Sequence, residues 1–240
     1  MATTPSIVIN ARNAVGQDES HLCSASDAEW LTVSVHRDVV EPFRTLRSAA
    51  ARVAIDLSVL SGFRSFDRQL SIWNRKARGE LAVLDSNARP MDITTLTQRD
   101  LVFSILRWSA LPGASRHHWG TDLDVYDASA KPAGYEIDLI PAEYEGEGMF
   151  APLSSWLDAH IASHTSFGFF RPYDRDRRGV APELWHLSFG PIASEYARVL
   201  TPSLLRETID SADMLLKDVV LQNLDEIFTR FVANTNPVMP

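Results

Sequence analysis

Cysteine is almost missing from this 240-residue sequence, and long apolar or basic runs do not occur. Cys23 is the only cysteine, so neither an intrachain disulfide nor a cysteine-built zinc site can form, and any metal must be held by His, Asp or Glu. No apolar run approaches the ~18 residues of a membrane-spanning helix. The sequence contains 23 Lys and Arg but 31 Asp and Glu, which gives a formal net charge of -8. Without a basic stripe, nucleic acid is not a predicted partner.

The beginning of the sequence also lacks a secretory signal, because residues 1–23 contain no charged start followed by a continuous apolar run. We therefore expect a cytoplasmic protein, with export by a route that the sequence does not show as the alternative. The length allows one large domain, or one domain with an appendage. With 45% hydrophobic and 22% charged residues, the composition is typical of a globular protein.

Helical and strand patterns are mixed along the chain. Apolar residues at helical spacing predict helices, and short alternating or apolar runs between turn residues predict strands. The expected helices lie at 41–55, at 66–78, after the Thr97–Asp100 capping box, and between 150 and 161. The expected strands are 57–62, 121–126, 135–140 ("YEIDLI"), "FGFF" and "LWHLSF". This irregular order favours an α+β fold over a doubly wound sheet.

The last part of the chain is predicted to be helical and without site chemistry. Its apolar positions Leu215, Val219, Ile227 and Phe231 follow a helical pattern. We therefore divide the chain into a first domain at 1–194 and a helical C-terminal extension at 195–240.

The stretch "SRHHWGTDLD" (115–124) is dense in residues that bind metals. His117 and Asp124 are seven apart, and Gly120 lets the chain fold back between them. A catalytic zinc usually has three protein ligands and an open position for water. A third ligand is offered by His186 in "PELWHLSF", and Glu183 just before it is a candidate base for the zinc-bound water. In a regular strand Glu183 and His186 would point to opposite faces, so the strand must begin after Glu183.

These residues resemble the signature of the zinc D-alanyl-D-alanine carboxypeptidases and dipeptidases (VanY/VanX-like), S-x-H-x-x-G-x-A-x-D followed by E-x-W-H. The matching residues are Ser115, His117, Gly120, Asp124, Glu183, Trp185 and His186, and "SGFRS" with Gln69 is similar to the family's upstream segment. The resemblance covers roughly residues 40–190. It implies the fold of the hedgehog signalling domain, a small and mainly antiparallel sheet flanked by helices.

The resemblance also implies a set of roles. Zn²⁺ would be bound by His117, Asp124 and His186, with Glu183 as the base. Arg64 would bind the substrate and stabilise the oxyanion, and Gln69 and Ser115 would contact the substrate. That substrate would be a peptidoglycan stem peptide or another D-Ala-terminated peptide. The alternative is a zinc-containing binding module of the same fold, but such a module has no need of Glu183.

Several neighbouring residues need separate interpretation. Asp122 stands where the family usually has Ala, so it competes with Asp124 as a ligand or orients one from behind. The spacing places His118 at the rim or behind the ligands. We expect His21, His36, His160 and His164 at ordinary surface or helix positions and Trp185 as a packing residue beneath the site. Residues 171–178 are expected to form a solvated loop, which precedes Glu183 closely enough to border the cleft.

Overall fold

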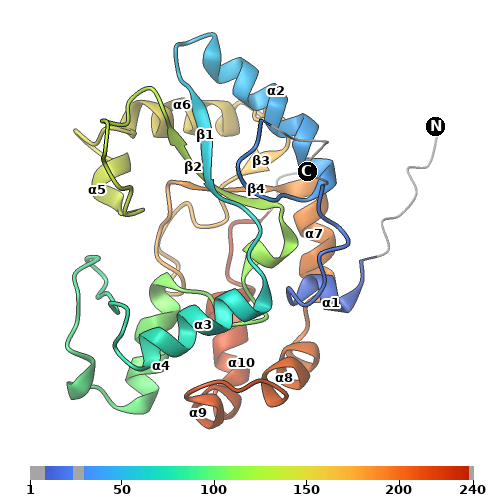
Figure 1. Ribbon diagram of the computed structural model, residues 1–240, viewed down its shortest axis with the longest axis vertical. Coiled ribbons are helices and arrows are strands. Elements are labelled where there is room, and N and C mark those ends of the chain that lie inside the picture. Colours follow the sequence, from blue (N-terminus) through green and yellow to red (C-terminus); the bar gives the residue numbers. More distant parts are fainter. Residues whose placement is uncertain (1–8, 24–29, 238–240) are drawn as a thin grey trace.

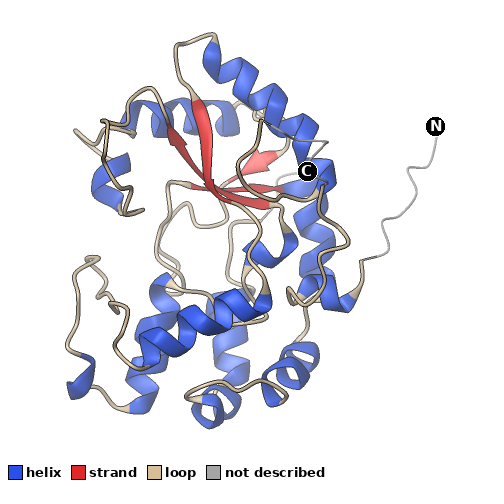
Figure 2. Cartoon of the chain, in the orientation of Figure 1, coloured by secondary structure: helices blue, strands red, loops and turns tan. Residues whose placement is uncertain are grey.

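A small antiparallel sheet forms the centre of the computed structural model, which describes residues 9–23 and 30–237. Its strands are arranged in the order β1-β2-β4-β3 (Figures 1 and 2). Their bounds are Leu57–Ser61 (β1), Asp122–Asp127 (β2), Phe169–Phe170 (β3) and His186–Phe189 (β4). In the β2–β4 register Asp124 pairs with His186. The strands expected at 57–62, 121–126, "FGFF" and "LWHLSF" are confirmed; β2 is shifted by one residue, and the other three are shorter than expected.

The longer helices follow the predicted apolar periodicity. They are Val40–Ala51 (α2), Phe66–Ala77 (α3), Gln98–Trp108 (α4) and Ala151–Ala162 (α6). α2 ends earlier than expected, and Ala54 has a left-handed φ of 62°. At the start of α4, the Thr97 side chain accepts the Asp100 N–H and its hydroxyl donates to the Asp100 carboxylate. This reciprocal pair confirms the predicted cap.

Shorter elements connect these helices to the sheet. The α-helices are Ala11–Ala14 (α1), Pro141–Tyr144 (α5) and Gly190–Val199 (α7), and the 3-10 turns are Arg37–Val39 (η1), Ile93–Thr95 (η2) and Arg116–Trp119 (η3). α2 and α6 lie with the sheet, whereas α3 and α4 lie with the C-terminal helices in the other half of the molecule (Figure 1). The α+β prediction is confirmed.

The strand predicted at 135–140 is wrong. This segment is an extended loop that leads into α5. Its polar groups bind one carboxylate instead of a neighbouring strand: Glu143 accepts the N–H groups of Asp138 and Ile140 and the hydroxyl of Tyr135. Because Glu143 satisfies these donors, the alternating pattern needs no sheet partner.

The C-terminal segment is helical, as expected. It contains Pro202–Asp210 (α8), Lys217–Gln222 (α9), Leu224–Ile227 (α10) and the π-helical turn Phe228–Val232 (η4). Leu205, Ile209 and Ile227 are fully buried in the same hydrophobic core as the sheet. The division after residue 194 stays a prediction; in the structure it falls within α7. Among the described residues, no helix has the length and apolar character needed to cross a membrane.

Candidate metal centre and active-site cavity

Three side chains predicted to bind a metal come together at one end of the sheet. His117 lies in η3, Asp124 in β2, and His186 at the first position of β4. Because Asp124 and His186 are paired in register, their side chains share one face of the sheet. One potential ligand atom from each of the three residues lies within 4.8 Å of the others. The structure therefore assembles the predicted ligand set from segments far apart in sequence.

Gly120 makes the return from η3 to β2 possible. Its φ is 65°, and a Cβ atom there would lie 2.7 Å from the backbone nitrogen of His36. Its own N–H donates to the carbonyl of His117. A side chain at this position would be strained by the backbone angle and would collide with the neighbouring segment.

Hydrogen bonds fix which ring nitrogen of each histidine faces the cluster. Nδ1 of His117 is 2.8 Å from the carbonyl oxygen of Gly62, so Nδ1–H donates there and Nε2 is left 3.4 Å from Asp124. Nε2 of His186 is 2.9 Å from Asp122, and Nδ1 is left 3.6 Å from Asp124. Two imidazole nitrogens and one carboxylate converge in this way, a donor set that suits Zn²⁺.

Asp122 lies behind His186 rather than in the ligand cluster. Its fully buried carboxylate also accepts hydrogen bonds from Arg116 at 2.7 Å, Thr121 at 2.7 Å and Ser188 at 3.1 Å. Burial alone would raise the pKa of Asp122, but the Arg116 charge and the bonds from His186 and Thr121 hold it below its usual range. Asp122 is therefore an ionised partner that orients His186.

Glu183 precedes β4, so the alternation of side chains along a strand does not force Glu183 and His186 to opposite faces. Its backbone N–H donates to the carbonyl of Tyr173, and its carboxylate lies 3.0 Å from Nδ1 of His186. Burial would lower the pKa of His186, but hydrogen bonds to Asp122 and Glu183 outweigh it and raise the pKa to about 10. With Asp124 as the third carboxylate, the cluster strongly favours a bound positive charge.

Arg64 is held at the edge of the cluster by its neighbours. Its guanidinium donates to the Gln69 side-chain oxygen at 2.9 Å and to the Ser61 hydroxyl at 3.4 Å. The Gln69 amide donates in turn to the carbonyl of Ala110, and Gln69 is fully buried. Both ends of this amide are bonded within the protein. Gln69 is therefore placed to position Arg64, and its predicted contact with the substrate stays a prediction.

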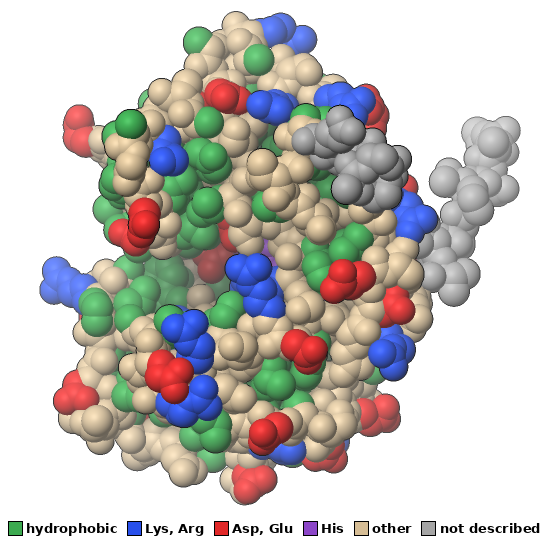
Figure 3. Space-filling model, in the orientation of Figure 1, with side chains coloured by type: hydrophobic (Ala, Val, Ile, Leu, Met, Phe, Trp, Pro, Cys, Tyr) green, Lys and Arg blue, Asp and Glu red, His purple; other side chains and the backbone are tan. Residues whose placement is uncertain are grey.

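The cluster opens into a cavity of about 300 Å³. The predicted site residues on its wall are Arg64, Ser115, His117, Asp124, Glu183 and His186. Figure 3 shows a hollow on this face, between the half that carries the sheet and the half with α3, α4 and the C-terminal helices. Trp185 packs against Tyr144 in a small apolar cluster, as expected of a residue beneath the site.

Residues 171–178 were predicted to form a solvated loop, which is wrong for their first part. Arg171 is 2% exposed and bonds to the Ser154 carbonyl and hydroxyl. The ring of Tyr173 contacts His186 edge-on at 5.1 Å between centroids and lines the cavity. Sequence analysis missed Tyr173, although Pro-Tyr among six charged residues was a signal of burial.

The surface position expected of two other histidines is also wrong. His21 and His36 are 8% and 2% exposed. His118 is fully buried behind Arg64, where its Nδ1 donates to the Arg64 carbonyl at 2.6 Å. His160 bonds to its own helix, as expected.

Comparisons with known proteins agree with this geometry. The family model "VanY: D-alanyl-D-alanine carboxypeptidase" matches residues 32–192. An uncharacterized protein of Haemophilus influenzae is 32% identical over 125 residues, which cover 51% of this chain and 93% of that protein. A second uncharacterized protein of the same organism is 33% identical over 96 residues, or 40% of this chain and 66% of that one.

Solved structures show a similar fold. The LdcB LD-carboxypeptidase aligns with a TM-score of 0.50 and 18% identity, covering 90% of this chain and 80% of that one. VanYB in complex with D-Alanine-D-Alanine aligns with a TM-score of 0.49 and 20% identity, covering 82% and 92%. The family match spans most of the chain and contains the whole residue cluster described above. The chain belongs to the VanY family of D-alanyl-D-alanine carboxypeptidases.

Proposed function

We propose that this protein is a zinc metallopeptidase that hydrolyses the peptide bond next to a D-alanine in peptidoglycan stem peptides, as a D-alanyl-D-alanine carboxypeptidase. One observation carries the proposal: His117, Asp124 and His186 converge on a cavity that also presents Glu183 and Arg64. A metal-binding module needs the first three residues only. The carboxylate and the guanidinium on the same wall favour hydrolysis over binding alone.

Zinc would be held by Nε2 of His117, the Asp124 carboxylate and Nδ1 of His186. When bound in such a site with an open position, zinc lowers the pKa of its water to about 7 and polarises a carbonyl group. The chain itself contributes the orientation of both imidazoles, through Gly62 and Asp122. Hydrogen-bond partners of this kind fix the tautomer and the orientation of a histidine ring that binds a metal.

Glu183 is the proposed general base. Its side chain is 12% exposed and lies beside the ligand atom of His186, so it is within reach of a water in the cavity. It would take a proton from the attacking water and return it to the leaving amine. Because Glu183 lies before β4, its side chain does not follow the alternation of faces along that strand and can point to the same side as His186.

Arg64 is the proposed donor to the substrate carbonyl oxygen as negative charge develops there. Burial lowers the pKa of Arg64, and the nearby carboxylates of Asp124 and Glu183 raise it; an arginine stays charged under these conditions. Its bonds to Gln69 and Ser61 fix its direction before substrate arrives, which is what electrostatic stabilisation requires. Ser115, 1% exposed on the cavity wall, remains a proposed substrate contact.

The test is hydrolysis of defined peptides by the zinc-loaded protein. A stem pentapeptide ending in D-Ala-D-Ala should release free D-alanine, detected by mass spectrometry, and a chelator should stop the release. A peptide ending in L-Ala-L-Ala is the stereochemical control. Stoichiometric zinc without release of any amino acid from a panel of D,D and L,D peptides would favour the binding module instead.

A further inference from the structure

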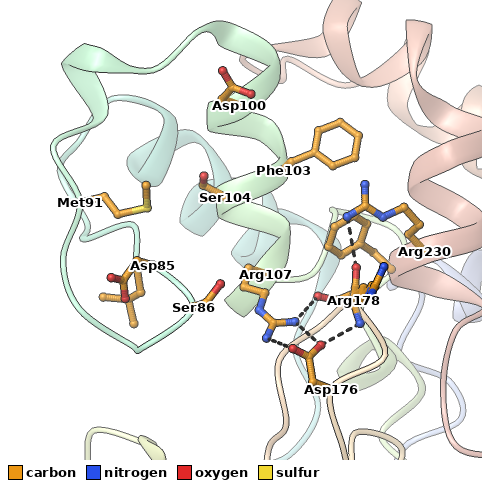
Figure 4. Close-up of a pocket in the computed structure, with 13 residues that line it drawn as sticks. Asp85, Ser86, Met91, Asp100, Phe103, Ser104, Arg107, Asp176, Arg178 and Arg230 are labelled. Carbon is orange, nitrogen blue, oxygen red and sulfur yellow. Dashed lines mark hydrogen bonds and ion pairs between the residues drawn. The ribbon is translucent and has the colours of Figure 1, made fainter.

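A second cavity of about 480 Å³ lies beside the catalytic cavity (Figure 4). Its walls come from the loop between α3 and α4, from one face of α4, from the loop after β3 and from η4. In Figure 4 the α4 side chains stand between Asp85 and Met91 of the first loop and Asp176 and Arg178 of the second. Nothing in the proposed hydrolysis uses this cavity.

The two cavities are adjacent along three chain segments. Leu84 lines both of them. On α4, Arg107 lines the second cavity and Trp108 the catalytic one, and in the loop after β3 the same holds for Gly179 and Val180. Neighbouring residues of the chain therefore face the two spaces, and the bonds of Arg107 to Asp176 and to the Gly179 carbonyl lie at the boundary between them.

The arginines of this cavity differ in their pairing. Arg107 makes two 2.9 Å bonds to Asp176, and Arg230 bonds to Glu226 at 2.6 Å. Arg178 is exposed, and across residues 9–23 and 30–237 its guanidinium has no carboxylate within ion-pair distance. Both oxygens of Asp176 already accept from Arg107. Among the described residues Arg178 therefore has no carboxylate partner at ion-pair distance, although its charge still acts on the nearby Asp176 carboxylate, in a protein of net charge -8.

The backbone that carries Arg178 is fixed in place. Its N–H donates to Asp176 at 2.7 Å, and its carbonyl accepts from Arg230 at 3.2 Å. A Cβ atom at Gly179 would lie 1.9 Å from the Arg230 carbonyl oxygen, so only glycine allows this close approach. The guanidinium is thus mounted on an ordered loop, which reduces the entropy lost when a ligand binds.

We propose that this second cavity is a substrate subsite for a carboxylate-bearing residue of the peptide, upstream of the scissile bond, and that Arg178 binds the carboxylate. The inference rests on the proposed function. Arg178 has the charge and the planar donors that match a carboxylate. The two acidic side chains opposite, Asp85 and Asp100, stay ionised while they accept hydrogen bonds from their own segments, so the attraction for a carboxylate comes from Arg178 at the other end of the cavity. Stem peptides carry such carboxylates before their terminal D-alanines.

The experiment compares two substrates in the zinc-loaded enzyme. One is a stem pentapeptide with its free carboxylates, and the other is a diacylated lysyl-D-Ala-D-Ala without an upstream acid. Arg178→Ala should lower kcat/KM for the pentapeptide about tenfold or more, mainly through KM, as expected for loss of a charged hydrogen bond. The short peptide should be cleaved as by the wild type. Arg175→Ala, an exposed arginine of the same loop that does not line the cavity, is the control.

A binding measurement separates this proposal from the hydrolysis itself. Calorimetry with zinc-loaded Glu183→Ala should show pentapeptide binding that weakens when Arg178→Ala is added, even if no peptide were ever cleaved. A second variant, Ser104→Phe, fills the cavity from α4 and should weaken the pentapeptide in the same selective way. Equal effects of Arg178→Ala on both peptides, or none on either, would overturn the subsite.

Discussion

Two pairs of buried histidines lie in this molecule, and their surroundings are opposite. The rings of His117 and His186 are 4.9 Å apart, and those of His21 and His36 are 5.6 Å apart. In the second pair burial lowers both pKa values to about 4. In the first pair the pKa of His186 is raised to about 10 by hydrogen bonds to Asp122 and Glu183, against the effect of burial.

The difference lies in the carboxylates. Around His186, Asp122 is fully buried and Glu183 is only 12% exposed, and both carboxylates lie within 3.0 Å of the ring. The carboxylate nearest to His36 is Asp38, which is 3.6 Å away and 45% exposed, so water screens its charge. Burial of histidine therefore does not make a metal site by itself. Negative charge placed in the same buried volume favours a cation there, whether the Arg116 guanidinium, a protonated imidazole or a bound metal ion.

The largest effect should come from removing one ligand. His117→Ala leaves two of the three ligands, so zinc content should fall from one per chain to nearly none, and hydrolysis should stop. His21→Gln, from the other pair, should keep both. Elemental analysis of metal-replete, refolded protein measures the zinc content. His164→Ala, which removes an exposed histidine, is the control for the loss of an imidazole elsewhere. Full zinc in His117→Ala would remove His117 from the proposed ligand set.

Glu183→Ala should separate metal binding from chemistry. Zinc should stay at one per chain, because none of the three ligands changes. Turnover should fall by ~10² to 10⁴-fold, the usual contribution of a general base. Peptide hydrolysis and zinc content are measured on the same samples, and Glu183→Gln preserves the side chain's size. Zinc retention with unchanged turnover would exclude Glu183 as the base.

The ligand cluster could be predicted because its residues lie in short local motifs. The turn at Gly120 joins His117 to Asp124 locally, whereas His186 meets Asp124 through the long-range pairing of β2 with β4, which the resemblance to the family implied. Helix starts with their own caps, such as Thr97, were predictable for the same reason. Hydrogen bonds between residues close in sequence require particular residue types at short spacings, and these can be recognised in the sequence.

What could not be predicted depends on contacts between distant segments. Arg116 reaches Ser188 across 72 residues, and no spacing rule reveals that bond. Glu143 turns residues 135–140 into a loop through a side chain that follows them. The second cavity is assembled from four segments, and its charge balance appears only when their pairings are known.

The role of buried carboxylates beside the first histidine pair can be tested on Asp122, which bonds to His186. Asp122→Ala removes the acceptor for His186 Nε2–H, so zinc affinity should fall about 10 to 100-fold, as is typical for such partners. Asp124→Ala should lose more, since it removes a ligand. Titration against a competing chelator measures both affinities, and Asp122→Asn, which keeps an acceptor oxygen, should recover part of the loss. A larger fall for Asp122→Ala than for Asp124→Ala would overturn the ligand assignment.

The smallest effect concerns the other histidine pair and acid stability. In the folded chain His21 accepts the Asn13 amide on one nitrogen and donates to the His118 carbonyl from the other, a pattern that only the neutral ring satisfies. Its pKa falls from 6.5 to about 4, so the unfolded chain binds the proton more readily. The free energy of unfolding should therefore decrease as pH falls from about 6.5 to about 4, by roughly 1 to 2 kcal/mol per histidine between pH 7 and 5. Urea unfolding of the zinc-free protein at both pH values measures this loss, which His21→Gln should reduce by the share of one ring. The same loss in the variant would assign the acid sensitivity to groups other than His21.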